Sequence, residues 1–318
     1  DFSFMLRGLS LLLFVCAVWA SDCASASMDN EMPSPFYRVL CYNTNQQIMS
    51  GHDVIILQNL LIRSPYVNSS LSCDGEFDYE TSVAVGAFQT GNNLNADSIF
   101  GPSTANVLLN LHSCDGYKDA GKPASYYGSQ YLYKFHFQVF RNRSFETIGT
   151  LYNANNVLVH QFRLRTHGWD NATANPPWPY WSNTVGLNMF TSNGNTPTGL
   201  AEADLNSPEP DPTSYGPFPI NRMINGIEGN AKFLLDYSNP VRSGILLHTG
   251  EWRMNSDWVA SMDMPNSEGC IHAHPYDIEQ IWQYLVGLGV EVHENPGGQI
   301  PYPYKAQGLF SVEQVGCQ

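Results

Sequence analysis

The chain has 318 residues, enough for two domains, and only 14% of them are charged. The formal net charge is −14, which argues against nucleic acid as a partner, because its phosphates require basic surfaces. No run after residue 20 is long and apolar enough to span a bilayer, so we expect no membrane span once the N-terminal signal described next has been removed.

Residues 1–26 have the pattern of a secretory signal peptide. Arg7 supplies a positive charge, an apolar run extends from Leu9 to Trp19, and Ala20 or Ala26 ends a small-residue cleavage site. The run covers about 11 residues, fewer than the roughly 20 that a membrane helix needs, so a cleaved signal is favoured over the alternative of a retained anchor. The pattern predicts a secreted, extracellular protein.

Three N-x-Ser/Thr triplets follow, at Asn68, Asn142 and Asn171. Such triplets arise by chance, but together with the signal they predict a secreted glycoprotein of a eukaryote.

Seven cysteines are present; Cys16 would leave with the signal, and Cys23 would also leave if cleavage follows Ala26, so that five remain. In an oxidising compartment we expect Cys270 to stay unpaired and four cysteines to pair in one of three ways. These four are Cys41, Cys73, Cys114 and Cys317. Cys41 and Cys114 flank the first predicted domain, so a bridge between them would clamp its ends.

Residues 41–116 are expected to form a module of three helices. The first begins near Ser50, a predicted N-cap, and buries one apolar face. That face carries Val54, Leu57, Leu60 and Leu61. The second follows Asp78 and directs Val83 and Ala87 inward, and the third begins at Pro102, a favoured first-turn residue.

A weak repeat links these helices. The segment 74–81 aligns with 97–104, with Asp, Phe and Thr recurring 23 residues apart. With Gly51-His52-Asp53 and Phe88-Gln89, these landmarks make the stretch resemble the peptidoglycan-binding domain family, which implies a three-helix fold and peptidoglycan or a related glycan as partner. Ser98 stands where that family usually has glycine. A helical spacer that binds nothing is the alternative interpretation.

Residues 117–130 are predicted to be a linker, because glycine, lysine, proline and serine are frequent there. From Tyr131 apolar and polar residues alternate, which indicates strands. We therefore expect an α+β protein: a small three-helix N-terminal module, then a mostly β domain over 131–300 and a C-terminal tail over 301–318. Residues 192–218, rich in Pro, Gly, Ser and Asn, are expected to form a long loop over a cleft.

The sharpest chemical signal is a histidine followed by a cysteine turn. His248 ends an apolar run, and Cys270 follows it by 22 residues in the turn Ser267-Glu268-Gly269-Cys270. A helix is predicted soon after the turn, which would lower the pKa of a thiol at its start. Backbone amides of the turn can stabilise an oxyanion. Nucleophile, base and oxyanion site are the parts that acyl transfer needs, so we expect Cys270 and His248 to lie within hydrogen-bond reach.

These residues resemble the L,D-transpeptidase (YkuD-like) family over roughly 131–295, and Thr196-Pro197-Thr198-Gly199 matches a frequent element of it. The resemblance implies Cys270 as nucleophile, His248 as general base and oxyanion donors from the Gly269–Cys270 turn. It further implies a peptidoglycan stem peptide as acyl donor, an amine or water as acceptor, and susceptibility to carbapenems.

The motif departs from the family pattern at two positions and in its spacing, since the gap from His248 to Cys270 is several residues longer than usual. Glu268 replaces its second His, and His272 stands where Arg or Asn is usual. A carboxylate beside a thiol raises the pKa of that thiol. The nucleophile and the base are thus retained, whereas the residues that read the substrate are altered. We assign Glu268, His272 and Thr249 to substrate contact. The alternative function is a catalytically silent wall-binding or structural glycoprotein on the same fold. No cofactor and no metal ion are expected, and the sequence does not determine the oligomeric state.

Overall fold

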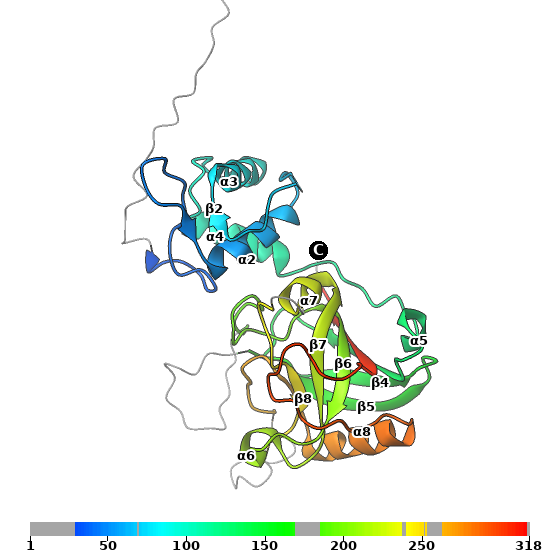
Figure 1. Cartoon of the computed structure of the whole chain (residues 1–318). Coiled ribbons are helices and arrows are strands. Elements are labelled where there is room, and N and C mark those ends of the chain that lie inside the picture. The colour runs from blue at the N-terminus through cyan, green and yellow to red at the C-terminus, as the bar shows by residue number, and fades with distance from the viewer. Residues whose placement is uncertain are drawn as a thin grey trace, which may run out of the picture.

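The computed structural model describes residues 29–68, 70–168, 185–236, 240–250, 252 and 263–316. It has an N-terminal helical module and a β-rich domain built around a closed barrel, joined by a short connection (Figure 1). The fold is therefore mixed α+β, as predicted. Within the described residues, no helix has both the length and the apolar character needed to cross a membrane.

Three helices build the module: α2 (His52–Ile62), α3 (Tyr79–Gly91) and α4 (Pro102–His112). A two-stranded sheet of β1 (Met49–Ser50) and β2 (Glu76–Phe77) accompanies them. Two of the three predicted helix starts are confirmed, because the Asp78 side chain caps α3 at Thr81 N and Pro102 opens α4. The predicted cap of α2 is wrong, since Gly51 is its N-cap and no side chain bonds there.

The helix faces follow the predicted pattern in α2 and differ in α3. The four apolar residues predicted for the α2 face are fully buried. In α3, however, Val83 is exposed, whereas Val85 and Phe88 are buried. The face was predicted one position out of phase, since Ala84 and Phe88 are buried in place of Val83 and Ala87. The module also packs a segment that precedes α2: Phe36 is buried and its ring lies 4.7 Å from that of Phe100.

The repeat has a physical basis in two buried glutamines. Gln58 Nε2 donates to Asp74 Oδ1 at 2.9 Å, and its Oε1 accepts from the Gly75 amide at 2.8 Å. Gln89 does the same in the second copy, with Asp97 at 2.9 Å and the Ser98 amide at 2.9 Å. Each glutamine therefore holds one turn that leads into the next helix.

The barrel has eight strands in the order β10-β3-β4-β5-β9-β8-β7-β6. Their bounds are β3 (Tyr133–Val139), β4 (Thr147–Asn153), β5 (Leu158–Arg165), β6 (Gly199–Asn206), β7 (Ile220–Glu228), β8 (Leu246–His248), β9 (Ile271–Ala273) and β10 (Gly308–Gln314). Helix α5 (Ala124–Tyr127) precedes β3, and α6 (Pro212–Tyr215), α7 (Gly229–Leu234) and α8 (Pro275–Gly287) lie between later strands. Its interior is aromatic: the rings of Phe135 and Phe310 stack 5.0 Å apart.

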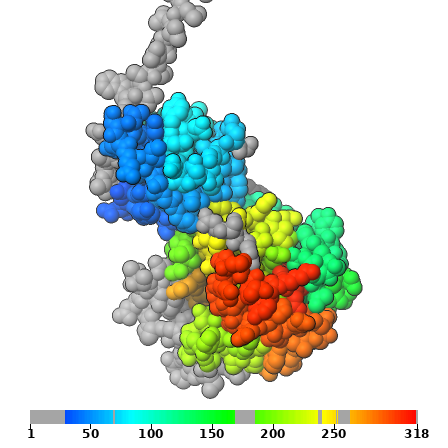
Figure 2. All heavy atoms as spheres, in the orientation of Figure 1, coloured from blue at the N-terminus to red at the C-terminus, as the bar shows by residue number. Residues whose placement is uncertain are grey.

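Three expected irregular segments contain regular structure. The expected tail 301–318 carries β10, which pairs with β3 and β6 and so closes the barrel. The expected linker 117–130 carries α5, and the expected loop 192–218 contains β6 and α6. Closure needs a strand from a distant part of the chain, and local composition carries no information about such pairing. Figure 2 shows the segment after α8 lying on the barrel surface beside the end of β7.

Module and barrel are joined by polar contacts around Asn230 of α7. Its side-chain amide donates to His112 O at 2.8 Å, and its oxygen accepts from Arg63 Nη1 at 3.0 Å. The Asp115 carboxylate accepts from Asn230 N at 2.7 Å and from Thr198 Oγ1 at 2.9 Å. The end of α4 is thereby held against the start of β6 and α7.

Candidate active site

Cys270 ends a tight turn that only glycine at position 269 allows. Gly269 has φ +103°, and a Cβ there would lie 2.0 Å from Arg242 Nη2. The Gly269 carbonyl accepts from Thr196 Oγ1 at 2.9 Å, which fixes the turn against the Thr196-Pro197-Thr198-Gly199 segment. The predicted helix start at Cys270 is wrong: the strand β9 follows immediately, and α8 begins at Pro275. The thiol therefore gains no stabilisation from a helix N-terminus.

His248 ends β8 and is held as a neutral imidazole. Its Nδ1 lies 2.8 Å from Thr249 O, and because a carbonyl only accepts, Nδ1 carries the proton and Nε2 keeps a free lone pair. Burial lowers the pKa of His248 to about 4. The Tyr215 ring packs on the imidazole with centroids 5.0 Å apart. His248 therefore has the tautomer that a general base needs.

Thr249, expected at the substrate, is fully buried. It contributes the carbonyl that fixes the His248 tautomer.

A cavity of about 340 Å³ brings the cysteine and the histidine together. Its walls include Tyr215, Gly244, His248, Glu268, Cys270 and His272. The predicted hydrogen bond between Cys270 and His248 is not formed among the described residues; the thiol donates instead to Gly244 O at 3.4 Å. Burial raises the pKa of the Cys270 thiol to about 11, so the resting sulfur is protonated at neutral pH.

Glu268 and His272 both line this cavity, as expected of substrate-contacting residues. Glu268 is exposed, and its charge raises the pKa of the thiol, the direction predicted from the sequence. His272 is buried, and its Nδ1 lies 2.8 Å from Pro265 O. Its ring meets that of His248 edge to face with centroids 4.8 Å apart, and burial lowers the pKa of His272. Two neutral imidazoles therefore adjoin the cysteine.

Only part of the expected oxyanion site is open. The Gly269 amide already donates to Ser267 Oγ at 3.1 Å. The same hydroxyl lies 2.7 Å from Cys270 O, so it ties the two ends of the turn together. The Gly269 amide would have to leave Ser267 before it could bind an oxyanion.

Two arginines near the thiol were missed in the sequence. Arg242 and Arg222 both lower the pKa of the Cys270 thiol. Arg242 stands six residues before His248 in a chain with only 15 lysines and arginines, and this scarcity was the available signal. It could not reveal the location, because Arg222 lies on β7 and comes near the thiol through the pairing of β7 with β8, in which it lies opposite Leu246.

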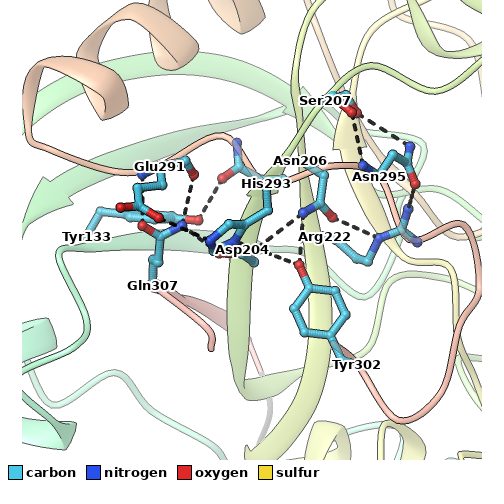
Figure 3. Close-up of polar contacts among 11 residues, drawn as sticks. Tyr133, Asp204, Asn206, Ser207, Arg222, Glu291, His293, Asn295, Tyr302 and Gln307 are labelled. Atoms are coloured by element: carbon cyan, nitrogen blue, oxygen red, sulfur yellow. Dashed lines mark hydrogen bonds and ion pairs between the residues drawn. The ribbon is translucent and has the colours of Figure 1, made fainter. Parts of the chain in front are cut away.

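A polar network holds Arg222 (Figure 3). Arg222 donates to Asn206 Oδ1 at 3.2 Å and Asn295 Oδ1 at 3.0 Å, and it pairs with Glu209 at 2.7 Å. The fully buried Asp204 anchors the network by accepting from four side chains. These are Asn206, His293, Tyr302 and Gln307. The network ties the segment after α8 to β6 and β7.

The cysteines correct one prediction. Cys41 and Cys114 are each disulfide-bonded, but Cys73 is a free, exposed thiol. The Cys73 sulfur instead contacts α2, with Asn59 Nδ2 at 2.6 Å and Ile55 O at 3.7 Å. Cys270 is free, as predicted. Cys317 lies outside the described residues, and a bridge between Cys41 and Cys114 stays a prediction.

The predicted glycosylation sites lie on different surfaces. Asn68 is exposed and Asn142 is half-buried, and each side chain accepts from the amide two residues on. Asn171 and the predicted signal peptide at 1–26 lie outside the described residues.

Comparison with protein families gives two matches. Residues 50–108 match the putative peptidoglycan binding domain, and residues 122–296, more than half of the chain, match the L,D-transpeptidase catalytic domain. A search of the curated proteins found no significant match.

Two solved structures align with the chain. One is a fused Zn-dependent amidase/peptidase/peptidoglycan-binding domain-containing protein from Clostridium acetobutylicum, with 14% identity, 86% of this chain and 99% of that chain covered, and a TM-score of 0.22. The other is an L,D-transpeptidase from Stackebrandtia nassauensis, with 13% identity, 87% and 99% covered, and a TM-score of 0.27. These scores are too low to carry an argument, so the assignment rests on the family matches. They show that the chain belongs to the L,D-transpeptidase catalytic domain family and carries a peptidoglycan-binding-type module before that domain.

Proposed function

We propose that the protein is a secreted cysteine acyltransferase or hydrolase that acts on peptidoglycan stem peptides. The observation that carries the proposal is the cavity shared by Cys270 and a neutral His248 with a free Nε2, within a domain of the L,D-transpeptidase family. The predicted signal and glycosylation sites suit a eukaryotic secreted protein that acts on bacterial wall. The module would hold the enzyme on the wall.

The chemistry divides into two balanced steps. His248 Nε2 takes the Cys270 proton as the sulfur attacks the stem carbonyl; a C–S bond forms, the C–N bond breaks, and the leaving amine takes the proton from His248. An amine or water then attacks the thioester carbonyl and passes its proton through His248 to the departing sulfur. Because Cys270 rests on Gly244 O, its side chain must turn toward His248 before the first step.

A catalytically silent wall-binding glycoprotein is the second candidate. The raised thiol pKa, the missing Cys270–His248 hydrogen bond and the Glu268 carboxylate favour it. In that case the module would be the functional part, and the cavity would only bind.

A carbapenem separates the two candidates, because acylation leaves a stable mass on the nucleophile. We expect one adduct per chain by intact-protein mass spectrometry, lost in Cys270→Ala and formed at least about tenfold more slowly in His248→Ala, since a positioned base contributes roughly a hundredfold or more. Cys73→Ala removes the other described free thiol and should keep the adduct. Failure to label the wild type, with no change in the stems of purified sacculi, would select the silent candidate.

A further inference from the structure

One edge of the Arg242 guanidinium is firmly bound. Nη1 donates to Met189 O at 3.0 Å and to Asn195 O at 2.8 Å, and the backbone amide donates to Leu234 O at 2.8 Å. Arg242 is only 3% exposed. The side chain is therefore held in one position between the loop before β6 and the start of β8.

Within the part of the chain that the structure describes, the opposite edge has no partner. Nε and Nη2 are buried and form no hydrogen bond, and among the described residues no carboxylate lies within salt-bridge distance of Arg242. Nε–H and Nη2–H are the two parallel donors with which arginine binds an anion side-on. Leaving such donors unpaired in the interior is costly, so an anion that appears only during function accounts for them.

The free edge lies beside the turn that carries Cys270. Arg242 Nη2 approaches Gly269 so closely that a Cβ there would be 2.0 Å away, and Gly269 directly precedes Cys270. From the other side, the carbonyl of Gly244, two residues after Arg242, accepts a hydrogen bond from the thiol. The guanidinium is therefore close to both backbone segments that hold the sulfur, the turn at Gly269 and the start of β8 at Gly244.

No other group described near the sulfur supplies a positive charge equivalent to that of Arg242. Arg222 is neutralised by Glu209 at 2.7 Å. Glu268 and the Tyr215 hydroxyl can carry only negative charge, and His248 and His272 are neutral. Burial lowers the pKa of Arg242 to about 10, so it remains a cation at neutral pH, and its charge lowers the pKa of the thiol.

We propose that Arg242 is the counter-ion of the Cys270 thiolate: its unpaired Nε–Nη2 edge stabilises the negative sulfur once His248 has taken the proton. Arg242 gives up no proton itself and acts through Cys270, so it is a positioning residue. The inference rests on the proposed role of Cys270 as nucleophile, but a small alkylating reagent tests it without any peptidoglycan chemistry.

The test is the iodoacetamide alkylation rate of Cys270 as a function of pH, in a Cys73→Ala background that removes the competing thiol. Arg242→Gln keeps hydrogen-bonding capacity but loses the charge, and should alkylate at least about tenfold more slowly at each pH below the midpoint, equivalent to a one-unit rise in thiol pKa. Arg242→Lys keeps the charge and should stay within about threefold of wild type. Arg38→Gln, which removes an arginine charge in the helical module that pairs with Asp53, should leave the rate unchanged.

Equal rates for wild type and a folded Arg242→Gln would overturn the inference, whether or not the protein acts on sacculi. A clear loss in Arg242→Gln without turnover of sacculi would keep the counter-ion and reject the proposed substrate. If Arg242→Gln does not fold, Arg242→Met, which removes the charge and keeps a long side chain, replaces it in the same alkylation test. A rate for that variant within about threefold of wild type would contradict the role.

Discussion

Glu268 is the residue whose chemistry most opposes catalysis at this site. It is exposed at the cavity, where its charge raises the pKa of the Cys270 thiol, while Arg242 acts in the opposite sense. Burial of the sulfur is the main cause of its raised pKa, and these two charges adjust how much thiolate is present at a given pH. In a protein that only binds wall material, neither the Glu268 charge nor the Arg242 charge would have a role at the sulfur.

We predict that Glu268→His and Glu268→Gln both speed alkylation of Cys270, by up to about fivefold, the range of an exposed charge pair. Rates of iodoacetamide labelling at pH 8 measure this. Glu294→Gln, which removes an exposed carboxylate remote from the cavity wall, should have no effect. A slower rate in both Glu268 variants would instead give Glu268 a role in orienting the base.

Among the structural elements, the paired turns of the module differ at one backbone position. Gly75 has φ +78° and Ser98 has φ +61°, so the serine occupies a left-handed conformation that suits glycine. Its amide still donates to Gln89, as the Gly75 amide does to Gln58. The sequence departure at Ser98 is therefore accommodated by backbone strain, with the turn intact.

Ser98→Gly should raise the free energy of unfolding by on the order of 1 kcal/mol, because it relieves that strain. The reverse change, Gly75→Ser, should lower it, since a Cβ at Gly75 would lie 2.9 Å from Ile55 Cγ1 in a strained backbone. Urea unfolding of the full chain measures both. If Ser98→Gly were destabilising, the contact of the serine side chain with Gly86 would outweigh the strain.

For the whole molecule, buried histidines link stability to pH: His112 and His248 act together with His272, whose pKa burial also lowers. His112 sits where the module meets the barrel, with Nε2 2.9 Å from Ser64 Oγ and its carbonyl bonded to Asn230. Burial lowers the pKa of His112, and likewise that of His248, to about 4. Between about pH 6.5 and 4 the unfolded chain therefore binds protons that the folded chain does not.

The sign of this effect follows from linkage. The stabilisation is fully present above the unfolded pKa near 6.5 and is lost as pH falls toward 4, with a slope of up to about 1.4 kcal/mol per pH unit for each histidine. Urea unfolding between pH 7 and 4 should show this decline, and His112→Gln should reduce its slope. An unchanged slope in His112→Gln would mean that the His112 pKa is not depressed in the folded state.

Both the sequence and the structure assign Cys270, His248 and the turn between Ser267 and Cys270 to one site. The candidate nucleophile and base could be predicted from the sequence, because a strand-ending histidine is followed along the chain by a glycine-containing turn with a cysteine. The three helices were readable for a similar reason: a capping aspartate, an N-terminal proline and an apolar face are local signals. The secondary structure that follows Cys270 could not be predicted from the sequence. The strand β9 comes directly after Cys270, and α8 begins only after that strand.

What the sequence by itself determined was the order of the parts: an α+β chain, a helical module with duplicated turns, and a cysteine turn after a strand-ending histidine. These are properties of residues close together in the chain, where periodicity, caps and turn glycines act. Only the tertiary structure decided that β10 closes the barrel, that the thiol rests on Gly244 and that an unpaired Arg242 edge lies beside it. Each of these depends on which distant segments pack together, and burial and charge at the sulfur are set by that packing rather than by neighbours in sequence.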